Sequence, residues 1–178
     1  DLSTGDPEWE TLNPIATGAR QETAVVAFED EIWVLGGFNE GLQIVPNVEV
    51  YDPATDTWRR AADLPSPMHH ANAAVVGDEI WVVGFLVQGF AADARTFVYY
   101  ASDDTWSPGP DMPDQRRRGS SAIGVIGTRI YVAGGLRSGA VSDFSVLDTA
   151  TGEWTSLPDV PRPVDHAAFG MINGRLVI

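Results

Sequence analysis

Hydrophobic and polar positions alternate along most of this chain with a period of two. Short segments rich in Val, Ile, Tyr, Trp and Phe are separated by Gly, Pro, Asp or Asn, and no stretch of a dozen residues carries a 3.6-residue repeat. Alternation of this kind is typical of half-buried β-strands, whereas an amphipathic helix would show the longer period. The pattern predicts an all-β chain.

One alternating stretch recurs along the chain. A strand that runs into two glycines covers residues 31–37, and related strands cover residues 79–85, 129–135 and 175–178. The copies begin at Ile32, Ile80, Ile130 and Leu176, which are 48, 50 and 46 positions apart. Self-similarity at such a period indicates a repeat architecture in which each repeat is one supersecondary unit.

The first repeat divides into four predicted strands. They cover residues 23–28, 32–35 and 48–51, and the fourth begins at residue 57. A variable loop is expected at residues 38–47. A turn is expected at residues 52–56, where Pro53 presets the backbone angle and the flanking Asp residues favour a bend.

Aromatic residues mark the same count. The tryptophans Trp9, Trp58, Trp106 and Trp154 are 49, 48 and 48 residues apart. Seven positions before them stand Leu2, Tyr51, Tyr99 and Leu147. Each copy consists of a large apolar residue, a polar turn and a tryptophan at fixed spacing. This regularity indicates a repeat, because aromatic residues scattered through a core would not be evenly spaced.

A strand with Gly-Gly, then Tyr-Asp, then Trp, at a period near fifty residues, resembles the kelch repeat over essentially the whole chain. The residues that carry the resemblance are Gly36, Gly37, Tyr51, Trp58, Gly84, Tyr99, Trp106, Gly134, Gly135 and Trp154. The resemblance implies that each repeat is one four-stranded antiparallel blade of a β-propeller, with Tyr and Trp packed between blades. In the second repeat Phe85 replaces a glycine and Tyr100 replaces the Asp, so a distorted turn is expected there.

The expected fold is a partial kelch-type propeller forming a single domain over residues 1–178. It comprises three complete blades and the two sides of a split fourth blade. Residues 1–13 end a preceding blade, residues 14–65, 66–113 and 114–161 form the complete blades, and residues 162–178 begin a further one. Because kelch propellers usually have five to seven blades, this chain is expected not to close such a ring alone. A fragment or half-propeller is favoured over a subunit whose partner completes the ring and over a tight four-bladed ring. Its open edges favour self-association into a homo-oligomer.

Composition excludes several functions. With 25 acidic and 11 basic residues the net charge is −14, which argues against nucleic acid and anionic membranes as partners. No run of 18 apolar residues exists to span a membrane. The absence of Cys excludes disulfides and zinc–thiolate sites. It also excludes the Cys–Tyr chemistry of kelch-type copper radical oxidases, and no cofactor is predicted. The cellular compartment stays undetermined.

Positive charge gathers on one predicted face of the propeller. The loops between second and third strands, and those between blades, carry Arg20, Arg95, Arg116, Arg117, Arg118, Arg137 and Arg162. This face is a candidate for binding an anionic small ligand or an acidic protein partner. The alternative is that these arginines neutralise nearby Asp and Glu. Arg117 is aligned with the Arg that often precedes the first strand of kelch repeats, which implies a structural role for it.

Two histidines share one register. His70 and His166 lie ten positions before Ile80 and Leu176, and Glu22 occupies the same place in the first repeat. Two imidazoles and a carboxylate can form a metal site. However, kelch repeats often carry His here for packing, and positions in different blades are expected to lie too far apart for one ion. No metal site is therefore predicted.

The predicted function is recognition, as a protein-interaction or ligand-binding scaffold. An apolar loop at residues 85–97 offers Phe85 and Phe90 as anchors for a partner, or else folds over the central opening. The alternative is a carbohydrate-acting enzyme similar to kelch-type sialic acid mutarotases. Such an enzyme would place a carboxylate such as Glu22 beside Arg20, Arg95 or Arg162, but no spacing assigns a catalytic residue.

Overall fold

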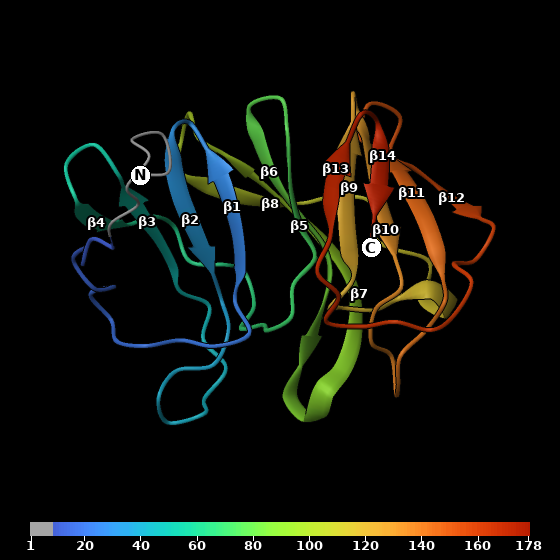
Figure 1. Ribbon diagram of the computed structural model, residues 1–178, viewed down its shortest axis with the longest axis horizontal. Helices are drawn as coiled ribbons and strands as arrows, with labels where there is room; N and C mark the ends of the chain where they lie inside the picture. The colour runs from blue at the N-terminus through green and yellow to red at the C-terminus, as the bar shows by residue number, and fades with distance from the viewer. Residues whose placement is uncertain (1–8) are drawn as a thin grey trace.

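Three four-stranded antiparallel sheets and one two-stranded sheet follow one another along the chain in the computed structural model, which describes residues 9–178 (Figure 1). The first sheet contains β1 (Ala24–Phe28), β2 (Glu31–Leu35), β3 (Val48–Asp52) and β4 (Thr57–Arg60). The second contains β5 (Ala73–Val76), β6 (Glu79–Val87), β7 (Ala91–Tyr100) and β8 (Thr105–Pro108). The third contains β9 (Ala122–Ile126), β10 (Arg129–Ala133), β11 (Phe144–Asp148) and β12 (Glu153–Leu157). The last pairs β13 (Gly170–Ile172) with β14 (Arg175–Val177).

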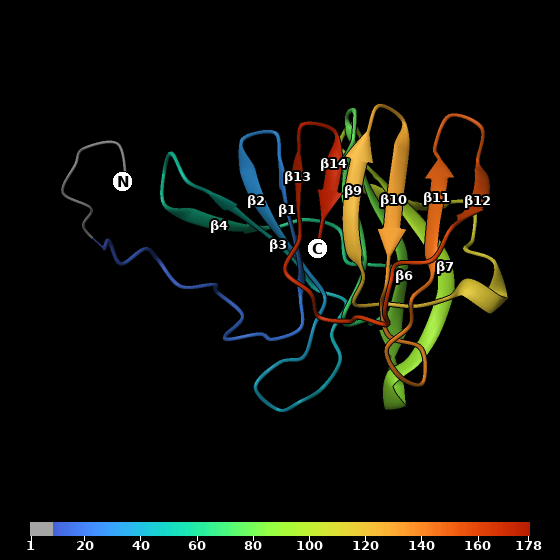
Figure 2. The ribbon, with the colours of Figure 1, turned by 45° about the vertical axis from the view of Figure 1, so that its right-hand side comes forward.

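The sheets are arranged as propeller blades. In each complete sheet the strands pair in chain order, and the first strands β1, β5, β9 and β13 contact one another in sequence. Figures 1 and 2 show the sheets fanning out from these inner strands. The prediction of an all-β partial propeller is confirmed. Of the predicted preceding blade, residues 1–8 lie outside the described residues, and residues 9–13 contain no strand.

Two apolar layers hold the blades together. Strand β6 is buried on both sides because it lies in the middle blade. Ile80 and Val82 pack into the layer shared with the first blade, whereas Trp81 and Val83 pack into the layer shared with the third. The two faces of β6 thus pack against different blades, because successive side chains of a strand point to opposite sides of the sheet.

The glycines at the end of the second strands permit close contact between blades. Gly36 and Gly134 have φ values of 59° and 63°, in the left-handed region. A Cβ on Gly36 would lie 2.5 Å from the carbonyl oxygen of Met68, and one on Gly134 would lie 2.4 Å from that of Val164. The N–H groups of Gly37 and Gly135 donate to these same two carbonyls, so each glycine pair anchors the next blade.

The tryptophans join consecutive blades by hydrogen bonds. The indole N–H of Trp106 donates to the carbonyl of Ala62 at 3.0 Å, and that of Trp154 donates to the carbonyl of Pro110 at 2.9 Å. Trp58 donates in the same way to Asn13, at 2.8 Å. The packing of Trp between blades that the kelch resemblance implied is therefore present. Trp9, by contrast, lies exposed.

The expectation of a loop at residues 85–97 is wrong. Strand β6 continues to Val87 and turns through the short 3₁₀ element η1 (Gln88–Phe90) into β7, forming a long hairpin. The register shifts between Val83 and Phe85, so the distortion expected in this repeat is a β-bulge. Phe85 is fully buried and its ring stacks on Phe97 with the centroids 6.0 Å apart. Phe85, an apolar residue in place of the second glycine, allows β6 to continue to Val87.

The β2–β3 connection and the tip of the β6–β7 hairpin emerge on one side of the molecule, here called the loop face. The β1–β2, β9–β10 and β13–β14 turns lie on the opposite side (Figure 2). The second 3₁₀ element, η2 (Asp114–Arg116), precedes β9. Within residues 9–178, no helix has the length and apolar character needed to cross a membrane.

Candidate functional site

Four residues in the same register form a backbone ladder from blade to blade. Glu22, His70, Ser120 and His166 all adopt positive φ, between 48° and 56°. The N–H of His70 donates to the carbonyl of Glu22 at 3.0 Å, Ser120 donates to His70 at 2.8 Å, and His166 donates to Ser120 at 3.3 Å. Positive φ is uncommon outside glycine, and it persists where the surrounding structure holds it. The repeat thus places one side chain per blade around the inner strands.

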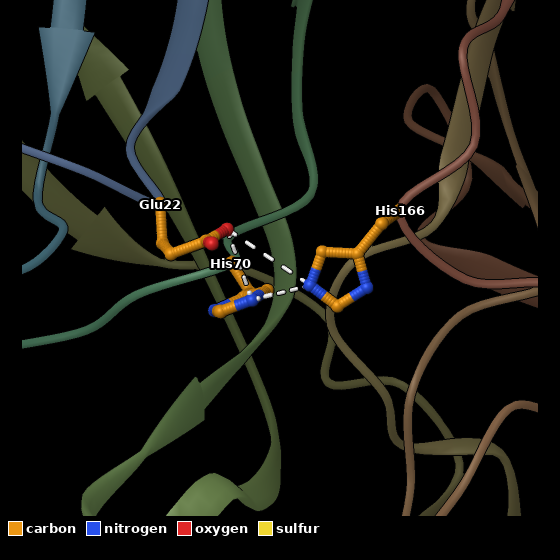
Figure 3. Close-up of side chains that lie close together, drawn as sticks. All are labelled: Glu22, His70 and His166. Atoms are coloured by element: carbon orange, nitrogen blue, oxygen red, sulfur yellow. Dashed lines mark hydrogen bonds and ion pairs between the residues drawn. The ribbon is translucent and has the colours of Figure 1, made fainter.

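Three of these side chains converge, as Figure 3 shows. Nε2 of His70 lies 2.7 Å from Nε2 of His166 and 3.0 Å from a carboxylate oxygen of Glu22. The Glu22 carboxylate lies 3.9 Å from Nε2 of His166. We call Glu22, His70 and His166 the axial cluster. The expectation that residues of different blades would lie too far apart for one ion is wrong for these three, because one candidate ligand atom from each lies within 4.8 Å of the others.

A further histidine that sequence reasoning did not single out supports the cluster. Nδ1 of His69 is hydrogen-bonded to Nδ1 of His70, and Nε2 of His69 lies 3.1 Å from the carbonyl oxygen of Val87. Burial lowers the pKa of His69, and burial, more than its charged neighbours, lowers the pKa of His70 to about 4. Burial thus favours the neutral form of both rings. The His-His doublet in the sequence is the signal that could have identified His69.

The axial cluster opens into a cavity of about 330 Å³ on the loop face. Its wall combines the three cluster residues with Gln21, Phe38, Leu42 and Phe90. Phe90 and Leu42 are each at least half exposed, and the Phe90 ring packs edge-on against His69 and His70. The site therefore presents apolar surface beside imidazole and carboxylate groups. Phe90 was expected at a contact surface, and Phe38 and Leu42 lie in the variable loop expected at residues 38–47.

Two of the loop-face arginines are buried supports of their blades. Arg20 donates to the carbonyls of Gly36 and Asn47 at 3.0 and 2.9 Å, and forms an ion pair with Glu49 at 2.7 Å. Burial lowers the pKa of Arg20. Arg118 holds the corresponding place in the third blade.

Arg118 donates to the carbonyls of Gly134 and Val132 at 2.7 and 2.8 Å. Burial lowers the pKa of Arg118 to about 10. The alignment of Arg117 with the structural Arg of kelch repeats is therefore wrong by one residue. The guanidinium of Arg117 is instead half exposed and lies 3.5 Å from Asp114.

The remaining loop-face arginines lie beside carboxylates. Arg95 pairs with Asp93 at 2.8 Å, and both Arg116 and Arg137 pair with Asp143 at 2.9 Å. Arg162 borders a separate cavity of about 790 Å³ next to the last sheet. Of the predicted site residues, Glu22, His70, His166 and Phe90 line one cavity. Arg116 and Arg137 meet instead at Asp143, and Arg95 lies over the ring of Phe85.

Comparison with known proteins agrees with the repeat architecture. The family model described as the KLHDC2/KLHL20/DRC7 Kelch-repeats domain matches residues 2–178. The chain belongs to the kelch-repeat family.

Among curated relatives, the Kelch-like protein terF of Aspergillus terreus is 37% identical over 191 residues, covering 96% of this chain and 42% of that protein. An N-acetylneuraminate epimerase of Salmonella typhimurium is 31% identical over 65 residues, covering 34% of this chain and 17% of the enzyme. The chain therefore matches less than half the length of either relative. The solved structure of YjhT superimposes with a TM-score of 0.84 at 19% identity, covering 99% of this chain and 63% of that one. At that identity the likeness shows the fold alone.

Proposed function

We propose that this kelch domain is a recognition scaffold whose binding site is the cavity around the axial cluster. The observation that carries the proposal is the exposed apolar surface of Phe90 and Leu42 beside the polar cluster. Both residues sit on connections between strands, while the blades behind them are locked by inter-blade hydrogen bonds. Rigid elements that display variable loops are a common way to build a binding site.

A protein segment suits this cavity better than an anionic small ligand. Six of the seven loop-face arginines donate to carboxylates or backbone carbonyls of their own chain. A ligand anion would have to compete with those partners. An apolar side chain entering beside Phe90, with polar groups reaching His166, requires no such competition.

Site-specific photocrosslinking tests the recognition site. A photoreactive phenylalanine analogue at position 90 is expected to give discrete adducts in extract of the source cells. The same analogue at Tyr100, an exposed aromatic position of similar size, serves as the control. Adducts that form equally at both positions, or that persist when Leu42→Asp alters the cavity wall, would contradict the proposal.

We also propose that further kelch blades cover the open faces of the first and last sheets. Val25 of β1 and Ile172 of the last sheet are each more than half exposed, and Val177 of the last sheet is half exposed. Exposed apolar residues on the flat faces of terminal blades are the surface that propeller neighbours normally bury. The covering blades can come from a second copy of this chain.

Sedimentation velocity tests whether a second copy supplies the covering blades. The protein is expected to form a dimer at high concentration, and Ile172→Glu should shift it to monomer. Ile126→Glu, at an exposed isoleucine of the complete third blade, is the matched control. A monomer throughout the concentration range would contradict self-association.

Acid–base chemistry on a carbohydrate is a second candidate function. Glu22 lies within hydrogen-bonding reach of His70 and opens into the cavity, and the partial match to an N-acetylneuraminate epimerase points to the same class. Proton NMR of freshly dissolved N-acetylneuraminate anomers is the test: acceleration of their interconversion should be lost in Glu22→Gln. Interconversion at the rate of buffer alone would remove this candidate.

A further inference from the structure

The hydrogen bonds behind the axial cluster determine which nitrogen of His70 carries its proton. The carbonyl oxygen of Val87 can only accept, so the facing Nε2 of His69 must carry a proton. The Nδ1···Nδ1 contact needs one donor and one acceptor, and the His69 tautomer that donates from Nε2 accepts at Nδ1, so the facing Nδ1 of His70 donates. In the His70 tautomer that donates from Nδ1, Nε2 is consequently a bare lone pair, and it faces Glu22 and His166.

Two electron-rich atoms therefore face each other, the Nε2 lone pair of His70 and the Glu22 carboxylate. The His70 lone pair lies 3.0 Å from a Glu22 carboxylate oxygen, and neither of these atoms has a proton to share with the other. Nε2 of His166 approaches the same point from the last blade. A carboxylate and a lone pair at hydrogen-bond distance repel each other unless a cation or a proton stands between them.

We propose that Glu22, His70 and His166 form a binding site for one divalent first-row transition ion such as Zn²⁺, Co²⁺ or Fe²⁺. The candidate ligand atoms all lie within 4.8 Å of one another. Metal–nitrogen bonds of about 2.0–2.1 Å place two imidazole nitrogens of one ion roughly 3 Å apart. The 2.7 Å between the two Nε2 atoms widens to that separation by a small movement of the half-exposed His166 side chain.

The surroundings of the cluster suit such an ion. Two imidazoles and one carboxylate favour borderline transition ions over Mg²⁺ and Ca²⁺, which prefer oxygen ligands. His69 orients His70 from behind, as outer hydrogen bonds commonly do for metal-binding histidines. Glu22 and His166 are partly exposed and border the cavity, which provides an entry path and room for a further ligand.

A shared proton is the competing occupant. The tautomer of His166 with its hydrogen on Nε2 could donate to the Nε2 lone pair of His70, while Nδ1 of His166 lies 3.5 Å from Asp165. The two hypotheses are distinguished by metal binding: only the ion site predicts that the protein takes up metal in a fixed stoichiometry. The chain offers a clear background for this test, because it has no Cys and only the three histidines His69, His70 and His166.

The experiment is a titration of chelator-treated protein with Zn²⁺, followed by calorimetry, and with Co²⁺, followed by its visible absorption. Millimolar Ca²⁺ is present throughout to occupy scattered carboxylates on this acidic protein. One equivalent per chain should bind and raise the melting temperature. His166→Ala and Glu22→Gln should each weaken binding at least tenfold, while Glu40→Gln, at an exposed glutamate outside the cluster, leaves it unchanged.

His166→Ala is the decisive variant because this histidine is partly exposed and its replacement leaves the core intact. Circular dichroism verifies that the variant is folded. Absence of stoichiometric uptake by the unaltered protein would overturn the proposal in favour of the shared proton. Uptake that survives in His166→Ala would overturn it as well, by locating the ion elsewhere. Neither readout depends on the partner or on the sugar chemistry proposed above.

Discussion

The phenol of Tyr99 donates a 2.8 Å hydrogen bond to Asp104, and the same carboxylate oxygen accepts the backbone N–H of Ala62 at 2.7 Å. Ala62 belongs to the connection that leaves the preceding blade, so this carboxylate joins two blades through a buried phenol. The first blade repeats the arrangement with Tyr51 and Asp56, which also accepts the backbone N–H of Asn13.

The third blade lacks all parts of this arrangement at once. Leu147 replaces the tyrosine, Gly152 replaces the aspartate, and Pro110, which has no N–H, replaces the backbone donor. The three changes are mutually consistent, since an aspartate without a phenol or an N–H to bind would gain nothing. Tyr, Asp and the N–H therefore act as one unit.

Removing this unit from the second blade should destabilise the protein by a predictable amount. Tyr99→Phe loses one hydrogen bond and is expected to lower the free energy of unfolding by about 1 kcal/mol. Asp104→Gly leaves both the buried phenol and the Ala62 N–H unpaired, so about 2–3 kcal/mol is expected. Glycine is the appropriate replacement because Asp104 has a φ of 51° and glycine stands at this place in the third blade. Urea denaturation measures both losses.

A double-mutant cycle separates coupling from general damage. The combined Tyr99→Phe/Asp104→Gly variant should lose less than the sum of the single variants, because each removes the same hydrogen bond. Tyr100→Phe, at an exposed neighbouring position, is the control and should change stability by less than about 0.5 kcal/mol. Strict additivity of the two losses would show that the residues act independently.

The blade architecture was predictable because it depends on local, repeated signals. Strand alternation, the glycine pairs and the Trp spacing each recur at one period, and the strands of the first repeat lie within one residue of their predicted starts. Phe85 was the exception. Sequence reasoning identified it as a replaced glycine but not the consequence, because whether a strand ends or continues there depends on the packing of its ring against Phe97.

The candidate site was less predictable because it depends on distances between blades. The shared register of Glu22, His70 and His166 was visible in the sequence, but their convergence follows from the inter-blade backbone ladder. The arginines were predicted to form a positively charged binding face, because the sequence shows where charges lie but not what they bind. In the structure, Arg20 and Arg118 donate to backbone carbonyls, and no pattern of side chains reveals such partners.

Gly134 should not tolerate a side chain. Its φ of 63° already disfavours other residues, and an added Cβ would lie 2.4 Å from the carbonyl oxygen of Val164. Gly134→Ala is therefore expected to cost about 3 kcal/mol or more of unfolding free energy. Gly170→Ala is the matched control, since nothing lies within 4 Å of its added Cβ. Thermal and urea denaturation give the comparison, and equal losses in the two variants would contradict the close contact.

Tyr51 should ionise at an unusually high pH. Burial, followed by the hydrogen bond to Asp56, raises the pKa of Tyr51 to about 12, against about 10 for a free tyrosine. Because the folded state holds this proton more tightly, the stabilisation is complete below about pH 10 and is lost as pH rises through about 12. The difference in phenolate absorbance between the protein and Tyr51→Phe should have a midpoint near pH 12.

Two checks accompany this titration. Circular dichroism at each pH establishes that the protein is still folded when the phenol ionises. Asp56→Asn removes the facing negative charge and should shift the midpoint toward the free value. A midpoint near pH 10 in folded protein would contradict the buried hydrogen bond.

Arg118 and its neighbour Arg117 should differ sharply in their effect on stability. Arg118 is fully buried and satisfies the carbonyls of Gly134 and Val132, so Arg118→Met leaves buried acceptors without donors. A loss of about 3 kcal/mol or more is expected. Arg117→Met removes only an exposed contact of 3.5 Å with Asp114 and should cost less than about 1 kcal/mol.

The lysine variant of Arg118 distinguishes charge from geometry. Lysine keeps the positive charge but cannot donate in the planar fork that reaches two strand carbonyls together, so Arg118→Lys should recover only a small part of the stability lost in Arg118→Met. Full recovery would mean that the charge near Asp143 matters more than the hydrogen bonds. Because these bonds connect the entry of the third blade to the end of its second strand, their loss should also lower the cooperativity of unfolding, seen as a smaller dependence of the free energy on urea concentration.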